Sequence, residues 1–171
     1  ALNSSVDGVG EAAGFRLANG LVASVDDQLY TQDVNQVRRI GTDGTVSTLP
    51  AAYSGIPAMD AGGGTLYVTR TAGAVTELVD VGAGSSMVLP VAADMVLFDA
   101  RGNLFVAQYV QPDASSAVVI YRRAAGGSAF EPVVSGVRYL NSAAIDDEAM
   151  QARAAAMPRV ERRFMVLSPL R

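Results

Sequence analysis

The stretch that most constrains the fold is Asp94-Met-Val-Leu-Phe-Asp-Ala-Arg-Gly-Asn-Leu-Phe-Val-Ala107. Two short apolar runs flank a tight polar turn, and the second run begins with a leucine followed by an aromatic residue. This order of features is typical of two β-strands joined by a hairpin turn. We therefore expect residues 94–107 to form an antiparallel strand pair.

The same pattern occurs twice earlier in the chain. Leu29-Tyr30 and Leu66-Tyr67 take the place of Leu104-Phe105, and the three leucines are 37 and 38 residues apart. Each copy is followed by two more apolar runs, separated by Asp-Gly or Gly-rich turns, so that a repeat holds four short strands. Repetition at this spacing is typical of β-propeller blades.

The sequence therefore predicts an all-β protein, a β-propeller of four-stranded antiparallel blades with about three and a half blades present. A fourth copy begins at Leu140 and then departs from the pattern, because residues 147–157 favour a short helix by propensity. We expect a single propeller over residues 1–171, with blade repeats at about 19–49, 55–89, 93–134 and 140–171, and with residues 1–6 as the outer strand of a preceding blade.

An incomplete ring would leave a blade edge and an apolar blade face exposed. We therefore expect a missing part of the chain or another subunit to complete the propeller. Two alternatives stay open, a small closed ring of four blades and a β-sandwich with similar hairpins.

Composition excludes several classes of function. The chain has no cysteine and no histidine, which excludes disulfides, thiolate metal sites and a serine–histidine triad. All 13 basic residues are arginine, and 17 acidic residues give a net charge of −4, which argues against a nucleic-acid partner. No apolar run is long enough for a membrane-spanning helix. The chain begins at Ala1 without methionine, and we expect a secreted or periplasmic protein.

Three segments resemble known propeller families. Asp7-Gly-Val-Gly-Glu-Ala-Ala-Gly-Phe15 with Ala18-Asn-Gly-Leu21 is similar to the entry segment of NHL repeats, and Gln36–Ile40 with Asp43–Leu49 to their exit strands. Residues 93–107 look like a blade of the regucalcin/gluconolactonase group, to which strictosidine-synthase-like propellers are related. The resemblance covers roughly residues 5–146 and implies a propeller, commonly of six blades.

The same resemblance implies a candidate metal site. Lactonase-like propellers hold a divalent metal at the mouth of the central channel, on oxygen ligands from loops that enter the innermost strands. Asn19 and Asp94 match such positions, and Asn141 sits at the same place in the fourth repeat. Similar register in the three blades would point these side chains at one axis, where they would suit Ca²⁺ or Mg²⁺. Such a metal would polarise a lactone carbonyl and activate water.

A structural role is the competing interpretation of these residues. Asn and Asp at strand entries commonly make Asx turns or cap backbone groups. We expect Asp60, Asp99 and Asp146 to accept hydrogen bonds from turn amides. The remaining recurrent residues are assigned to the core between blades (Tyr30, Tyr67 and Phe105) and to exposed edge charges that discourage sheet pairing (Arg38, Arg39, Arg122 and Arg123).

The leading functional hypothesis is a binding or assembly module without catalysis or cofactor, which presents loops or blade edges to a protein, peptide or glycan. The alternative is a divalent-metal-dependent lactonase or esterase that uses Asn19, Asp94 and Asn141. A third hypothesis is that residues 147–171 dock the chain onto a larger assembly through Met150, Met157, Val160 and Phe164.

Overall fold

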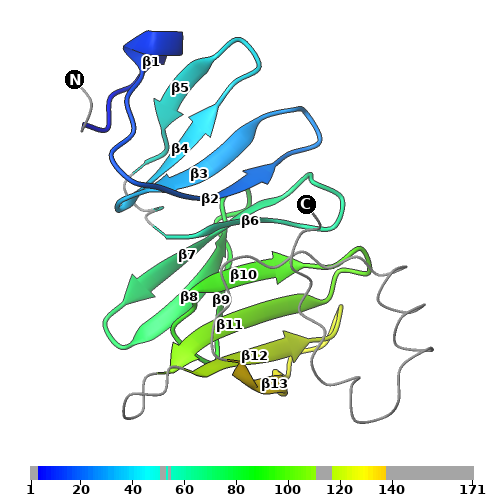
Figure 1. Ribbon diagram of the computed structural model, residues 1–171. Coiled ribbons are helices and arrows are strands. Elements are labelled where there is room, and N and C mark those ends of the chain that lie inside the picture. The colour runs from blue at the N-terminus through cyan, green and yellow to red at the C-terminus, as the bar shows by residue number, and fades with distance from the viewer. Residues whose placement is uncertain (1–3, 51–52, 54, 111–116, 138–171) are drawn as a thin grey trace, which may run out of the picture. The chain divides into compact units, whose positions relative to one another are not determined.

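The computed structural model describes residues 4–50, 53, 55–110 and 117–137, and within them every regular element except one short 3₁₀ turn is a β-strand. The prediction of an all-β protein is confirmed. The chain divides into two compact units, Ala1–Ala92 and Ala93–Arg171. The first unit holds two antiparallel sheets and the second unit holds one (Figure 1). The predicted fourth repeat at 140–171 and its helical insertion lie outside the described residues.

The first sheet is a four-stranded antiparallel meander with a fifth strand added at its outer edge. Its order is β1-β5-β4-β3-β2, so the chain's first strand lies beside the last strand of the meander. Strand β1 pairs with β5 through Gly8 opposite Val46 and Val9 opposite Thr45. The strands are β1 (Gly8–Val9), β2 (Ala18–Ala23), β3 (Leu29–Asp33), β4 (Gln36–Ile40) and β5 (Thr45–Thr48), and the 3₁₀ turn is Gly10–Ala12.

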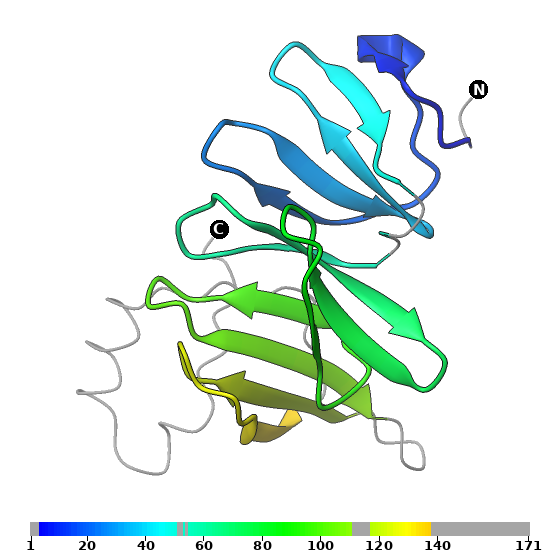
Figure 2. The same ribbon diagram turned by 180° about the vertical axis from the view of Figure 1, so that it is seen from behind.

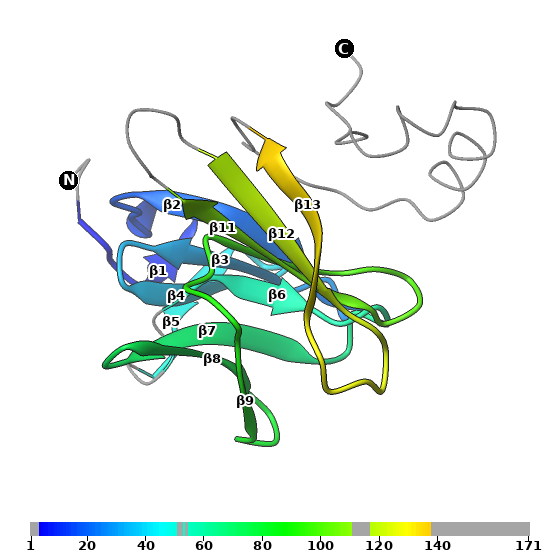
Figure 3. The same ribbon diagram turned by 90° about the horizontal axis from the view of Figure 1, so that it is seen from below.

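The second and third sheets repeat the meander with four strands each, in the orders β6-β7-β8-β9 and β10-β11-β12-β13. Figure 3 lets the reader follow β6 to β9 in this order, and likewise β11 to β13. The strands are β6 (Pro57–Met59), β7 (Leu66–Ala72), β8 (Val75–Asp80), β9 (Ser86–Val88), β10 (Met95–Phe98), β11 (Leu104–Val110), β12 (Ala117–Arg123) and β13 (Glu131–Val137).

The three leucines of the repeat occupy one structural position. Leu29, Leu66 and Leu104 each begin the second strand of a sheet, and each lies opposite the last residue of the first strand. The predicted spacing of four short antiparallel strands per repeat is thereby confirmed for the three described sheets. The aromatic residues that follow the leucines are all half-buried (Tyr30, Tyr67 and Phe105).

Glycines close the hairpins between the first and second strands of the second and third sheets. Gly63 and Gly102 have positive φ and donate their backbone N–H groups to the carbonyls of Asp60 and Asp99. An L-residue in this conformation is strained, so glycine is the natural choice. The Gly-containing segments therefore form hairpin turns, as their composition predicts.

Apolar side chains on alternate strand positions supply the core of each unit. In the first unit Val37, Val68 and Leu78 are fully buried, and in the second unit Leu104, Val106 and Val118 are. Burial of a side chain of this size contributes about 1.5–3 kcal/mol. Around Val118 and Ala107 the second unit packs Met95, Tyr109 and Ile120.

Within the first unit, the first strands of the two sheets lie side by side. Strand β2 contacts β6, and the backbone N–H of Val25, just after β2, donates to the carbonyl of Gly63 at 2.8 Å. Figures 1 and 2 show the two strands as neighbours from opposite sides. This adjacency is compatible with blades that meet at their innermost strands.

The N-terminal residues differ from the expectation. Residues 1–6 are predicted to form the outer strand of a preceding blade, but the described part of that stretch folds back on the first sheet. Val6 and Gly14 form an isolated antiparallel bridge, and residues 8 and 9 add a fifth strand to the first sheet itself. The physical reason is a set of polar contacts to Arg38 and Asp33, which are described below.

Candidate functional site

Asp94 stands directly before β10 and caps the neighbouring strand. Its Oδ2 atom accepts a hydrogen bond from the backbone N–H of Tyr109 at 2.7 Å, and its own N–H donates to the carbonyl of Ala107 at 2.9 Å. The carboxylate is exposed at the surface. Asp94 therefore extends the pairing of β10 and β11 by one residue, which is the structural role weighed for it.

Asn19 lies inside β2, next to an irregularity of the strand. Gly20 has a φ of 68°, and its carbonyl accepts a hydrogen bond from the Thr31 hydroxyl at 2.6 Å. Pairing passes from Asn19 opposite Gln32 to Val22 opposite Tyr30, so β2 has one extra residue. A glycine of positive φ at the first bulge position is a known form of β-bulge.

The bulge places Asn19 and Asp94 at different register positions. Counted from the leucines, Gln32 and Ala107 are equivalent, and they lie opposite Asn19 and Met95 respectively. Asn19 is thus the counterpart of Met95, one residue after Asp94. Because side chains alternate between the faces of a strand, the expectation of a shared register is not met by this pair.

The metal site at Asn19, Asp94 and Asn141 stays a prediction. Asn141 lies outside the described residues, and Asn19 and Asp94 belong to different units. Over residues 4–50, 53, 55–110 and 117–137, no group of three or more acidic side chains is placed so that it could hold a metal ion.

The turn aspartates behave as the sequence predicts. Asp60 Oδ1 accepts the N–H groups of Gly64 and Thr65 at 2.9 and 3.1 Å. Asp99 Oδ1 accepts those of Arg101 and Asn103 at 3.0 and 2.8 Å. The structural role is confirmed for Asp60 and Asp99, whereas Asp146 lies outside the described residues.

The third sheet adds a polar link around the same turn. Asn103 is buried, and its side chain donates to Asp99 Oδ2 at 2.6 Å. Its carbonyl oxygen accepts from Arg122 Nη2 at 3.2 Å and from the N–H of Ala125 at 3.1 Å. The turn after β10 is thereby joined to the turn after β12.

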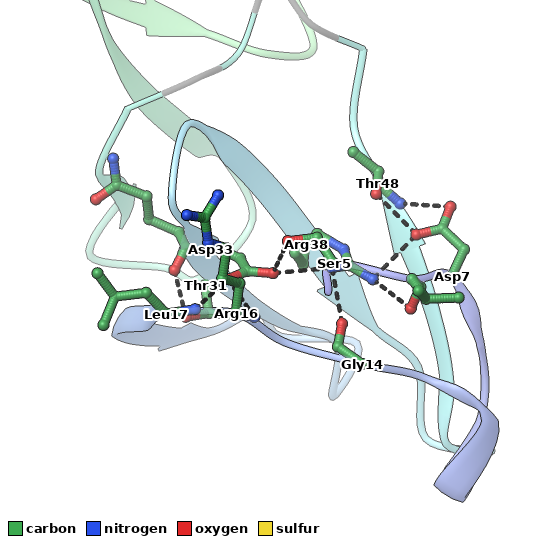
Figure 4. Close-up of polar contacts among 11 residues, drawn as sticks. Ser5, Asp7, Gly14, Arg16, Leu17, Thr31, Asp33, Arg38 and Thr48 are labelled. Atoms are coloured by element: carbon green, nitrogen blue, oxygen red, sulfur yellow. Dashed lines mark hydrogen bonds and ion pairs between the residues drawn. The ribbon is translucent and has the colours of Figure 1, made fainter. Parts of the chain in front are cut away.

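The most constrained polar group among the described residues is Arg38 of β4. Its side chain is fully buried and lies over the ring of Phe15, with 5.0 Å between the guanidinium carbon and the ring centroid. Nη1 donates to Asp33 Oδ2 at 3.0 Å and to the Gly14 carbonyl at 3.1 Å (Figure 4). Nη2 donates to the Val6 carbonyl at 2.8 Å and to Asp7 Oδ1 at 3.1 Å.

Asp33 of β3 is the buried anion that faces Arg38. Its Oδ1 atom accepts the backbone N–H groups of Arg16 and Leu17 at 3.0 and 2.7 Å, and its Oδ2 atom accepts the Ser5 hydroxyl at 2.6 Å. A buried ion pair is tolerated when its remaining hydrogen-bonding capacity is also used. Here the chain before β2 supplies partners for Asp33 and for both terminal nitrogens of Arg38, whereas Arg38 Nε is buried without a hydrogen-bond partner among the described residues.

Asp7 completes the cluster from the N-terminal side. Besides Arg38 it accepts the Thr48 hydroxyl at 2.7 Å on Oδ1 and the Thr48 N–H at 3.1 Å on Oδ2. Thr48 is the last residue of β5. Figure 4 shows Asp7 between Arg38 and Thr48, so that it links the N-terminal segment to two strands.

Both carboxylates of the cluster are acids of lowered pKa. Hydrogen bonds from the Thr48 hydroxyl and N–H, assisted by Arg38, lower the pKa of Asp7 below its ordinary value. Burial acts to raise the pKa of Asp33, but the bonds from Ser5, Leu17 and Arg16 and the charge of Arg38 together outweigh it, and the pKa is lowered.

This cluster corrects the expectation that Arg38 is an exposed edge charge. Arg39 and Arg122 are exposed, but Arg38 is not. A signal was present in the sequence, because adjacent residues of a strand face opposite sides. One arginine of Arg38-Arg39 must therefore face inward as soon as one side of the sheet is covered. The distant partners at residues 5–17 could not be read from the repeat.

No protein-family model matches the chain, and no curated protein sequence matches it at a significant level. Within the described ranges, no helix has the length and apolar character needed to cross a bilayer.

Proposed function

We propose that the chain is an extracytoplasmic binding or assembly module built from propeller-type blades similar to those of the NHL-repeat and gluconolactonase-like families. It presents strand-connecting loops or blade edges to a protein, peptide or glycan. The three meanders support the blade arrangement, since their second strands begin at equivalent leucines and β2 lies beside β6 in the first unit.

One observation carries the choice of a module over an enzyme. The described carboxylates at strand entries and turns accept backbone N–H groups, namely Asp60, Asp94 and Asp99. These bonds give the recurrent aspartates a structural purpose that needs no substrate.

Exposed apolar side chains on the first sheet are a second support. Leu17, Leu21 and Val25 on and beside β2 are 68%, 62% and 74% exposed. These three residues recur at every fourth position along one short stretch of chain, which makes this stretch a candidate contact surface.

A metal titration followed by thermal unfolding tests the proposal against the lactonase alternative. We expect the full chain to show the same unfolding temperature with Ca²⁺, Mg²⁺ or no metal. Stabilisation that grows with metal concentration and disappears in Asp94→Ala would favour the hydrolase, because a ligand stabilises only the state that binds it.

The Asp60→Ala variant is the control, since it also loses a carboxylate that accepts backbone amides, those of Gly64 and Thr65, where Asp94 accepts that of Tyr109. Each variant is compared with itself at zero metal, so that the loss of a hydrogen bond is not mistaken for the loss of a ligand. Metal-dependent hydrolysis of a simple lactone by the full chain, abolished in Asp94→Ala but not in Asp60→Ala, would overturn the proposal.

A further inference from the structure

One pair of equivalent positions on the second and third strands is polar in the first sheet but not in the second. The third residue of the second strand and its partner on the third strand are Val68 and Val79 in the second sheet, and Val106 and Tyr121 in the third. Val68, Val79 and Val106 are buried. In the first sheet the same two positions are Thr31 and Arg38, which are polar and equally buried.

The polar positions of the first sheet share one face. Register pairs Thr31 with Arg38 and Arg38 with Thr48, and Asp33 lies two residues after Thr31 on the same strand. We call this side the polar face, because Thr31, Asp33, Arg38 and Thr48 lie on it beside the apolar residues Leu29, Ile40 and Val46. Val37 points to the opposite side by alternation and is also fully buried.

The chain's own N-terminal segment covers the polar face. We call residues 4–17 the strap. Its Ser5 hydroxyl, its Val6 and Gly14 carbonyls, its Asp7 carboxylate and its Arg16 and Leu17 amides bond to Asp33, Arg38 or Thr48 (Figure 4). Strand β1 of the strap also pairs with β5 and covers the outer edge of the sheet.

In arrays of repeated sheets or helices, inner repeats bury apolar faces on their neighbours, whereas terminal repeats carry a polar outer face. The first sheet has the features of a terminal repeat. A further sheet on the polar face would have to displace the strap, and Arg38 and Asp33 would then lose most of their partners while remaining buried, which is strongly unfavourable.

We propose that the strap is an end cap, which closes the array of sheets at the polar face and prevents a second copy of the chain from packing there. The inference rests on contacts within the first unit, and it needs neither a ligand nor a metal site. An array that is closed at this face is an open arc of blades, so the cap argues against a ring completed through the polar face. It deals with this face alone, whatever occupies the opposite end of the array.

Two variants of the full chain release the strap in different ways. Arg38→Val removes the central donor and places at this position the residue that the second sheet carries at Val79. Asp7→Ala removes the link from the strap to Thr48 and changes a half-exposed side chain rather than a core one. The matched control is Glu77→Ala, which breaks the partly exposed ion pair with Arg70 on the second sheet.

Hydrogen exchange reports whether the strap is released. We expect the Gly14, Arg16 and Leu17 amides to exchange about tenfold faster or more in both variants. Arg38→Val removes a charged partner of the strap, and Asp7→Ala removes a charged group of the strap itself. Amides of β7 and β8 keep their protection, which shows that the variants are folded. Unchanged exchange at these three amides in Asp7→Ala and Arg38→Val would overturn the proposal.

Sedimentation of the same samples reports whether the strap is a cap. Release uncovers Leu29, Ile40 and Val46, which share the polar face by register, and we expect both variants to self-associate with increasing concentration while Glu77→Ala does not. Variants that release the strap and still sediment as the unaltered chain does would contradict the end cap. The metal titration does not bear on this result, so a failure of the proposed function is distinguishable from a failure of the cap.

Discussion

Arg38 and Asp33 show how a single buried ion pair fixes a long segment of chain. The two side chains are fully buried and 3.0 Å apart, and between them they bond to both ends of the strap. Partly exposed pairs such as Arg70 and Glu77 contribute less to stability, because water still solvates the separated charges. A buried charge that has lost its partner cannot be solvated by water in this way.

Replacing Asp33 by asparagine removes the buried anion that faces Arg38 and leaves the half-exposed Asp7 carboxylate as its remaining charged partner. We expect the free energy of unfolding to fall by about 3–5 kcal/mol, as found when one partner of a buried pair is removed. Urea unfolding followed by circular dichroism measures the change. Glu77→Gln, the control at the partly exposed pair, is expected to lose far less stability, and equal losses in the two variants would contradict the buried pair.

The Arg38 cluster also predicts a dependence of stability on pH. The pKa values of Asp7 and Asp33 are lower in the folded protein than the ordinary value of 3.8, so the unfolded chain binds protons first as the pH falls. The stabilisation is complete above about pH 5 and is lost as the pH drops through 3.8 towards the folded pKa values.

Urea midpoints between pH 6 and pH 3 test this dependence. We expect the unaltered chain to lose stability over this interval, and Asp33→Asn to lose less, because it lacks one of the two groups. Other carboxylates of lowered pKa, among them Asp60 and Glu77, are common to both proteins and cancel in the comparison. A variant that loses as much as the unaltered chain would show that Asp33 is not held as a carboxylate.

At the scale of elements, turn chemistry and strand spacing were readable from the sequence. The leucines at 29, 66 and 104 mark the second strands, and Asp60 and Asp99 accept turn amides as their positions predicted. The bulge at Gly20 was not anticipated, although Asn19-Gly20 is a sequence at which the chain readily leaves a regular strand. The pairing of β1 with β5 is a contact between distant segments, which no local pattern specifies.

At the start of the second sheet the backbone of Gly55 lies close to that of Thr69, and this close approach can be tested. A Cβ atom on Gly55 would collide with the Thr69 carbonyl oxygen, whereas one on Gly64 would meet nothing within 4 Å. We expect Gly55→Ala to lower the free energy of unfolding by about 1–3 kcal/mol through overpacking. Gly64→Ala is the matched control and is expected to be nearly neutral, and thermal unfolding of the two variants decides the matter.

For the whole molecule, the repeat predicts more than three similar sheets. Blades of a propeller are related by successive rotations, and a closed ring is typically made of four to eight of them. The sequence supports the number of strands per repeat, and the structure confirms it in three sheets. The metal ligands were harder to predict from the sequence. Their assignment assumes equal register in different repeats, and the extra residue in β2 alters the register of Asn19. The predicted fourth repeat and Asn141 stay predictions.

An experimental structure of the full chain tests the central claim most directly, through the rotations that relate its sheets. We expect that superposing β2–β5 on β6–β9, and then β6–β9 on β10–β13, gives similar rotations about one shared axis, with β2, β6 and β10 nearest to it. Sheets that are related by translation, or by rotations about unrelated axes, would contradict the propeller arrangement.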